Sequence, residues 1–195
     1  MIYINNLIGK KSIDLISSSL RSSVDLFFEK PNSDRSSLIL KEESNKKFAD
    51  YVFEEIGNDG FSRIEQVISA ISGCTVKKIK PEMMFLYCYK PGSFLGPHAD
   101  SYGGFDGDFY SVVGYLNDDY VGGELCVYGF STASVVMHDG IDGELPNYEP
   151  PPICSIKPEP GSVVIIKGSN FHHVNEVVDG NKFIFTILVP VIGCR

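Results

Sequence analysis

A change of pattern near Met83 constrains the fold more than any other feature of this sequence. From there on, apolar residues occur in short runs separated by glycine and proline, and we expect strands at 83–89, 110–116, 124–128, 162–167, 173–178 and 182–189. The preceding residues show helical periodicity instead. Many short strands after a helical block predict an α+β fold, a jelly roll (double-stranded β-helix) with N-terminal helices packed on one outer face.

Two apolar series at three- and four-residue spacing predict the N-terminal helices. The first series is Phe48, Val52 and Ile56, with Ser44 as a possible N-cap and Gly57 as a stop. The second series consists of Ile64, Val67, Ile68 and Ile71, ends at Gly73 and precedes an expected strand at 75–79. The serine- and charge-rich sequence between residues 16 and 47 predicts a loose connection.

The length of 195 residues favours one domain with a substantial core. We expect residues 1–80 to form a mainly helical support and residues 81–195 to form the jelly-roll core that carries any catalytic site. The segment from Gly129 to Pro160 is too long and too rich in proline for an ordinary hairpin loop. We expect this segment to project from the rim of the barrel.

The charge balance argues against nucleic acid as a partner. The formal net charge is −8, and no run of Lys and Arg forms a basic stripe. Nucleic-acid affinity depends largely on clustered cations that neutralise the phosphate backbone. The acidic balance mildly favours a neutral or basic substrate over a polyanion.

The cysteines and the N-terminus predict a soluble, cytoplasmic protein. Five cysteines are scattered without a Cys-x-x-Cys pair, which favours a reducing compartment and gives no sign of a zinc or redox motif. Polar residues interrupt the N-terminus too early for a signal-peptide core. No apolar run approaches the length that spans a bilayer, so no membrane association is expected.

A histidine and an acid two positions apart are the first candidate metal ligands. Side chains two apart on an extended segment point to the same side, so His98 and Asp100 can converge on one ion. Alone, such a triplet arises readily by chance. A second histidine is available at His172 or His173, which are neighbours and therefore point to opposite faces of a strand. Two imidazoles and one carboxylate on one face of an iron leave three positions open, which suits oxygen chemistry with a chelating co-substrate.

A single lysine in the apolar segment 182–189 suggests a buried anion site. The segment is apolar on both faces except where Lys182 and Thr186 share one face. A lysine at the start of a strand can extend into solvent, which is the alternative interpretation. On the interior face of a small barrel it needs an anionic partner, since an unpaired buried charge is strongly unfavourable. No acidic residue on the same strand supplies one, whereas a dicarboxylate co-substrate would.

Four sequence blocks then occur in a set order. Residues 89–100 contain a tyrosine, a glycine turn and His-x-Asp; residues 113–125 contain Tyr-Leu-Asn and Gly-Gly-x-Leu; residues 160–166 contain Pro-Gly and an apolar run; residues 172–182 contain His-x-Val-x-x-Val, a glycine and the lysine. From about Phe85 to Pro190 the sequence thereby resembles the Fe(II)- and 2-oxoglutarate-dependent oxygenases, in particular their prolyl-hydroxylase-like branch. It differs from that family at Glu176, where proline is usual, and in its longer 129–160 segment.

The resemblance implies a set of iron ligands. These are His98, Asp100 and His172, and His172 is selected over His173 because only that register also places the later glycine and lysine of the motif.

The resemblance also implies a co-substrate pocket. In it, Lys182 pairs with the far carboxylate of 2-oxoglutarate, Tyr115 and Thr186 help to hold that end, and Tyr89 lines the pocket.

The resulting hypothesis is a dioxygenase that hydroxylates an unactivated C–H bond, with a prolyl residue of a peptide or protein as the favoured substrate. Its implied cofactors are Fe(II), 2-oxoglutarate and dioxygen, with ascorbate as a further candidate. The alternatives are a hydroxylase of a free amino acid or other small molecule, a cupin-like metalloenzyme that uses no 2-oxoglutarate, and a non-catalytic metal-binding jelly-roll interaction module. Tyr102 and the glycine-rich residues 103–107 are candidates for a mobile lid over the iron.

Overall fold

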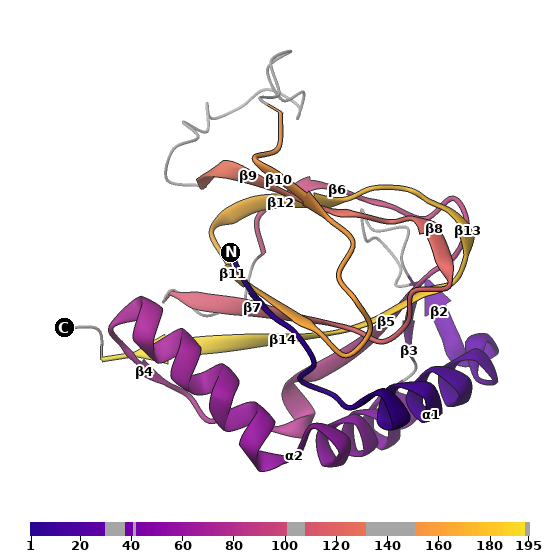
Figure 1. Ribbon diagram of the computed structural model, residues 1–195, viewed down its shortest axis with the longest axis horizontal. Helices are drawn as coiled ribbons and strands as arrows, with labels where there is room; N and C mark the ends of the chain where they lie inside the picture. Colours follow the sequence, from indigo (N-terminus) through magenta and orange to yellow (C-terminus); the bar gives the residue numbers. More distant parts are fainter. Residues whose placement is uncertain (30–37, 41, 101–107, 132–150, 194–195) are drawn as a thin grey trace.

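Two antiparallel β-sheets face each other, and the helices cover the outer face of the larger sheet (Figure 1). This computed structural model describes residues 1–29, 38–40, 42–100, 108–131 and 151–193. The arrangement is the predicted jelly roll with helices on one outer face.

The larger sheet contains strands from both ends of the chain. Its order is β1 (Ile2–Ile4), β11 (Val163–Lys167), β7 (Phe109–Tyr115), β14 (Lys182–Ile192), β5 (Met84–Tyr89), β3 (Leu38–Leu40) and β2 (Phe27–Glu29), and β4 (Thr75–Val76) also pairs with β14. The region before residue 80 therefore contributes strands to the sheet as well as the helical layer.

The opposite side of the barrel is formed by a smaller sheet and a separate ribbon. The smaller sheet has the order β10 (Cys154–Ile156), β9 (Leu125–Ser131), β12 (Asn170–Val174) and β6 (Leu95–His98). A separate two-stranded ribbon joins β8 (Tyr120–Gly122) to β13 (Val177–Gly180).

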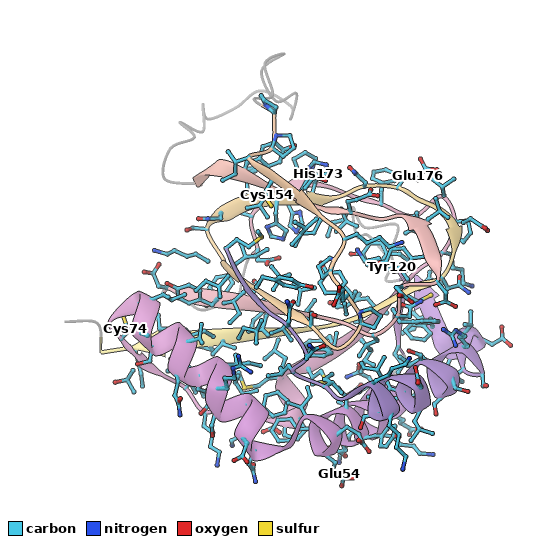
Figure 2. The ribbon with its side chains drawn as sticks, viewed as in Figure 1. Glu54, Cys74, Tyr120, Cys154, His173 and Glu176 are labelled. Atoms are coloured by element: carbon cyan, nitrogen blue, oxygen red, sulfur yellow. The ribbon has the colours of Figure 1, made fainter. Side chains whose placement is uncertain are left out.

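The larger sheet is buried on both faces, which explains why its strands are almost continuously apolar. On β7, Val112 belongs to the core cluster shared with the helices, whereas Val113 and Tyr115 belong to the cluster between the sheets. On β14, Phe183 and Ile184 divide between the two clusters in the same way. Side chains accordingly fill both layers (Figure 2).

The helical layer consists of α1 (Lys10–Arg21) and α2 (Glu42–Ser72), together with the short 3₁₀ helices η1 (Val24–Leu26) and η2 (Pro81–Met83). Helix α2 joins the two predicted helices. Gly57 lies at its middle with a non-helical φ of 68° and ψ of 168°, a conformation that glycine adopts readily. The predicted stop at Gly57 is thus a kink between two helical halves.

The predicted loose connection over residues 16–47 is wrong for most of its described part. Ile13, Ile16 and Leu20 follow helical spacing and are buried on α1, and the buried Ser17 donates a hydrogen bond to the carbonyl of Leu116. The high serine content hid this apolar face. Strands β2 and β3 and the start of α2 also lie within the predicted connection.

The later strands match the prediction with a few differences. The predicted strand at 173–178 is split into β12 and β13, and β6, β8 and β10 were not predicted. Strand β10 lies within the 129–160 segment, so that segment is not entirely a loop. Residues 132–150 of that segment lie outside the described residues, as do Tyr102 and the candidate lid at 103–107.

One cysteine differs from the expectation of free thiols. Cys74 is disulfide-bonded, whereas Cys88, Cys126 and Cys154 are free. Disulfide pairing depends on tertiary contacts and cannot be read from cysteine spacing. Among the helices that the structure describes, none combines the length and apolar character needed to cross a membrane.

We expect Gly114→Ala to destabilise the fold. Gly114 on β7 lies opposite Phe185 on β14, and an added Cβ would lie 2.0 Å from Cε1 of the Phe185 ring. Such overpacking costs about 1–3 kcal/mol, measurable as a lower free energy of unfolding in urea. Gly96→Ala is the matched control, because an added Cβ there meets nothing within 4 Å. Equal stability of the two variants would contradict the packing argument.

Candidate metal centre

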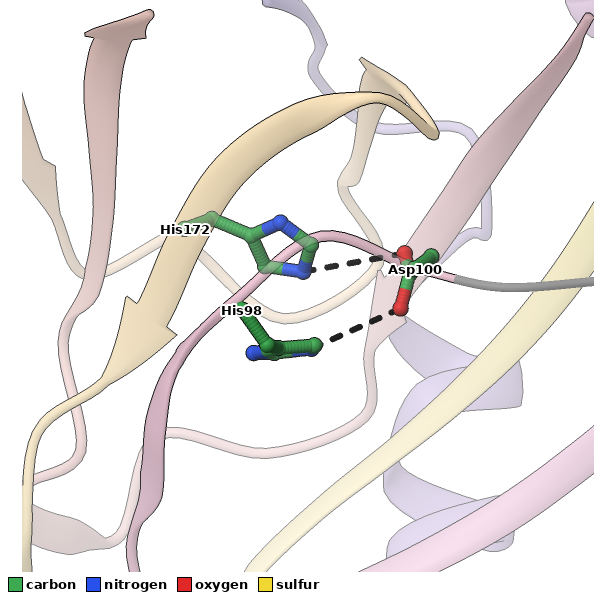
Figure 3. Close-up of side chains that lie close together, drawn as sticks. All are labelled: His98, Asp100 and His172. Atoms are coloured by element: carbon green, nitrogen blue, oxygen red, sulfur yellow. Dashed lines mark ion pairs between the residues drawn. The ribbon is translucent and has the colours of Figure 1, made fainter. Parts of the chain in front are cut away.

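The pairing of two strands brings the predicted ligands together. His98 is the last residue of β6, and His172 lies directly opposite it on β12. Asp100 follows His98 by two residues, and its backbone N–H donates a hydrogen bond of 3.0 Å to the carbonyl of Gly168. The three side chains converge at one point between the sheets (Figure 3).

The geometry of the three side chains suits a single cation. Nε2 of His98 lies 3.5 Å from Oδ1 of Asp100, and Nε2 of His172 lies 3.6 Å from Oδ2. The imidazole centroids are 4.3 Å apart. One potential ligand atom from each residue falls within 4.8 Å of the others. Two neutral nitrogens and one carboxylate oxygen are a donor set for a divalent transition metal.

Hydrogen bonds fix the orientation of both imidazoles. Nδ1 of His98 lies 2.8 Å from the carbonyl of Gly96, and Nδ1 of His172 lies 3.0 Å from the carbonyl of Asn170. Because a carbonyl can only accept, each ring carries its proton on Nδ1 and leaves the lone pair on Nε2 for a metal. Nε2 of His98 is buried and has no hydrogen-bond partner among the described residues. A metal ion would satisfy this atom.

Asp100 is held as a carboxylate. Burial tends to raise its pKa, but the nearby imidazoles of His98 and His172 and the hydroxyl of Ser111 together lower the pKa to about 2. The Ser111 hydroxyl donates to Oδ2 of Asp100. Ser111 was not among the predicted site residues. The only sequence signal for Ser111 is its polarity, because every other residue of the buried strand β7 is aromatic, aliphatic or glycine.

His172 and His173 point to opposite sides of β12. His172 has 5% exposure and faces Asp100, whereas Nε2 of His173 lies 2.9 Å from Oδ1 of Asn175 and its ring packs 5.5 Å from that of Tyr128. Adjacent positions on a strand point to opposite faces. His172 is therefore the histidine that can join the cluster.

Lys182 is buried in the same inter-sheet interior. Its side chain is 1% exposed, and Nζ donates a 2.7 Å hydrogen bond to the carbonyl of Gly123. Nζ lies 5.2 Å from the ring centroid of Tyr89, 5.3 Å from that of Tyr115 and 5.9 Å from that of Tyr120. No carboxylate among the described residues forms an ion pair with it. The lysine points inward, as the strand pattern predicted.

The environment of Lys182 weakens its hold on the proton. Burial lowers the pKa of Lys182 to about 7, against a smaller opposing effect from Glu124, and Lys157 lowers it further. An anion beside Nζ would favour the charged form and raise this pKa. The arrangement can therefore bind a carboxylate.

The remaining predicted residues lie at different places along this interior. Tyr89 is directly opposite Lys182 on β5, and Tyr115 on β7 lies opposite Ile184. Thr186 is half-buried on the same face of β14 as Lys182, four residues further along. Thr186 pairs with Val113 on β7, and two residues further along Leu188 pairs with Ser111, which contacts Asp100. Thr186 therefore lies on the path from the lysine toward the metal cluster.

Residues 84–189 match a protein-family model described as the 2OG-Fe(II) oxygenase superfamily. This range covers more than half of the chain and includes every predicted site residue. The chain belongs to the 2OG-Fe(II) oxygenase superfamily. Its cofactor is therefore Fe(II), with 2-oxoglutarate and dioxygen as co-substrates. A comparison with curated protein sequences finds no match.

Solved structures show the same fold for this oxygenase. A prolyl-4-hydroxylase from Pseudomonas putida aligns with a TM-score of 0.62 and 15% identity, over 98% of this chain and 92% of that chain. A prolyl hydroxylase from Trichoplax adhaerens, in complex with a hypoxia inducible factor peptide fragment, aligns with a TM-score of 0.62 and 16% identity over 98% and 82%. HygX from Streptomyces hygroscopicus, with nickel, 2-oxoglutarate and hygromycin B bound, aligns with a TM-score of 0.56 and 12% identity over 97% and 82%.

We expect His172→Ala to abolish tight metal binding while His173→Ala retains it. His172 faces Asp100, whereas His173 points to the other side of β12. Removing a residue that only supports a ligand weakens metal affinity by about 10- to 100-fold, and loss of a ligand itself should exceed that. The measurement is an anaerobic calorimetric titration with Fe(II), or with Mn(II) in air. Loss of binding in His173→Ala with binding retained in His172→Ala would show that the wrong histidine has been assigned, and an equal loss in both would contradict the distinction between them.

Proposed function

We propose that this oxygenase hydroxylates a prolyl residue in a peptide or protein. One observation carries the proposal: the interior between the two sheets contains both the cluster of His98, Asp100 and His172 and the buried ammonium of Lys182. In this assignment the cluster binds Fe(II) and the ammonium binds the far carboxylate of 2-oxoglutarate.

Among the described residues, His98, Asp100 and His172 would hold the metal from one side. His98 and His172 present Nε2 lone pairs, and Asp100 presents a carboxylate that the Ser111 hydroxyl orients. When bound, Fe(II) supplies the redox chemistry by which one oxygen atom of dioxygen enters a substrate C–H bond and the other enters succinate, as 2-oxoglutarate loses carbon dioxide. The residues of the cluster act by fixing position and charge.

The far end of the pocket selects the co-substrate. The Lys182 ammonium pairs with the distal carboxylate, while Tyr89 and Tyr115 flank it and exclude water. Thr186 donates a hydroxyl hydrogen bond on the same face of β14. An uncharged keto acid would leave the lysine without an anion, so this arrangement favours a dicarboxylate.

The substrate assignment is supported by the fold relatives that are prolyl hydroxylases, one of them in complex with a peptide. The net charge of −8 is compatible with a neutral or basic peptide. A small-molecule substrate is the second candidate, since HygX shares the fold and has hygromycin B bound. A non-catalytic interaction module would bind a partner without turnover.

The direct test is incubation in air with Fe(II), 2-oxoglutarate and a panel of proline-containing peptides. We expect succinate to form in step with a mass gain of one oxygen on the peptide, and His172→Ala to abolish both. Oxidation of free amino acids or other small molecules, with unchanged peptides, would favour the second candidate. Metal binding without succinate under any of these conditions would favour the interaction module.

We expect the affinity for 2-oxoglutarate to fall as the pH rises above about 7. The ammonium form of Lys182 binds the carboxylate, and its pKa in the free protein is lowered to about 7 by burial. Above that pH the charged fraction decreases, so the dissociation constant should rise by up to about tenfold per pH unit until the higher pKa of the complex is reached. The measurement is an anaerobic titration of the Fe(II) protein that follows the visible charge-transfer band of the chelate.

Lys182→Ala is the control for this pH dependence. The variant should bind 2-oxoglutarate much more weakly at neutral pH, retain Fe(II) affinity and lose the pH dependence above 7. A variant that binds 2-oxoglutarate as tightly as the unmodified protein would remove Lys182 from the co-substrate pocket. The charged and titratable neighbours that contribute to the pH profile are Glu124, Lys157 and Cys126.

A further inference from the structure

We propose that the hydroxyl of Tyr120 is an additional donor to the distal carboxylate of 2-oxoglutarate, next to the Lys182 ammonium. The inference rests on the proposed function and adds a residue that the sequence motifs do not identify. Tyr120 lies within the 113–125 block but is not among the predicted site residues.

Tyr120 belongs to the interior that holds the co-substrate pocket. It is the first residue of β8, lies opposite Gly180 on β13 and is only 4% exposed. Its ring belongs to the same core cluster as Tyr89 and Tyr115, and Figure 2 shows Tyr120 between the two sheets. Three tyrosine rings therefore surround the lysine.

The hydroxyl group of Tyr120 is buried without a hydrogen-bond partner among the described residues. Burying a hydroxyl in this way is unfavourable, and nearly all such groups in native proteins have a partner. A ligand that brings a hydrogen-bond acceptor would explain why the protein has a hydroxyl group at this buried position. The neighbouring Lys182 ammonium can only donate, so it cannot serve as that acceptor.

Close packing holds the Tyr120 ring against the lysine side chain. Lys182 Nζ lies 5.9 Å from the ring centroid. Gly123 lies between them with a φ of +68°, and an added Cβ there would be 3.2 Å from both Cδ of Lys182 and Cε2 of Tyr120. Absence of a side chain at Gly123 thus allows the lysine stem and the tyrosine ring to approach the same point.

Lys157 also restrains Tyr120. Its Nζ donates a hydrogen bond to the Tyr120 carbonyl and lies 4.1 Å from the ring centroid. A cation over an aromatic face at this distance is attractive. The contact restrains both the backbone and the ring, which prepares the hydroxyl in one position before the ligand binds.

The ionisation state of Tyr120 makes it a donor. Burial raises its pKa, and the negative charges of Glu124 and Asp118 raise it further, so the phenol keeps its proton at neutral pH. The pKa of Tyr115 is also raised, first by burial and then by the proximity of Tyr120. A protonated phenol beside an ammonium is suited to an anionic acceptor.

The test compares Tyr120→Phe with the unmodified protein in binding two ligands, 2-oxoglutarate and 2-oxopentanoate. The second ligand keeps the keto acid and chain length but lacks the distal carboxylate. Both are titrated anaerobically into the Fe(II) protein by the charge-transfer band and by calorimetry. We expect the variant to bind 2-oxoglutarate about 10- to 100-fold more weakly, the loss typical for a hydrogen bond to a charged group, and to bind 2-oxopentanoate unchanged.

Tyr110→Phe is the matched control, because Tyr110 is a buried tyrosine in the core cluster on the helix side of the larger sheet. It should bind both ligands as the unmodified protein does. Removing an unpaired hydroxyl should leave Tyr120→Phe at least as stable as the unmodified protein without ligand, which the unfolding temperature measures. An unchanged Fe(II) affinity would show that the metal site is intact in the variant.

The outcomes separate the inference from the proposed function. If the unmodified protein binds 2-oxoglutarate and Tyr120→Phe binds it equally well, the role of Tyr120 is wrong while the co-substrate assignment stands. An equal loss for both keto acids would also overturn the inference, because it would show a general disturbance of the pocket. If the unmodified protein gives no chelate band with 2-oxoglutarate, the proposed function fails and the role of Tyr120 fails with it.

Discussion

The antiparallel pairing of β12 with β6 is the interaction on which the metal centre depends. It places His172 opposite His98, which lies 74 positions earlier in the sequence, and Asp100 follows on the same segment as His98. A slip of one residue would turn His172 outward and bring His173 in. The carbonyls of Gly96 and Asn170 lie on these same strands and orient the two imidazoles. Strand register therefore determines both which histidine faces the cluster and which nitrogen it presents.

Strand β7 connects the two polar ends of the interior. Ser111, Val113 and Tyr115 alternate onto the face between the sheets, so Ser111 contacts Asp100 at one end while Tyr115 flanks Lys182 at the other. The apolar side chain of Val113 lies between them. A rigid, doubly buried strand thus sets the separation between the metal cluster and the cation. In the proposed assignment, this spacing suits a ligand that has a chelating group at one end and a negative charge at the other.

The sequence allowed prediction of the jelly roll and of the helical layer, because alternation and helical spacing are local properties. The grouping of His98, Asp100 and His172 was predicted from the resemblance to a known family, and the structure brings these three candidate ligands together. It did not reveal α1, since the serines between Ile13 and Leu20 resemble a loop until Ser17 is seen to bond to Leu116. Ser111 and Tyr120 were also not assigned to the site. Ser111 contacts Asp100 and Tyr120 contacts Lys182 from other strands, and no local sequence pattern encodes such contacts. The roles of Tyr89, Tyr115 and Thr186 stay predictions.

A buried lysine without a carboxylate partner opposes folding, and the pH dependence of this effect follows from its pKa. In the unfolded chain Lys182 titrates near 10.5, whereas in the folded protein burial lowers the pKa to about 7. Between these values the unfolded state binds more protons, so the contribution of Lys182 to stability improves as the pH rises through that range and is least favourable below 7. Hydrophobic residues could fill the same space without this penalty. An anion that binds beside Nζ would offset the penalty by stabilising the charged form of Lys182. At neutral pH, Lys182 would therefore take up a proton when the anion binds. The lysine is therefore better explained by a ligand than by the stability of the barrel.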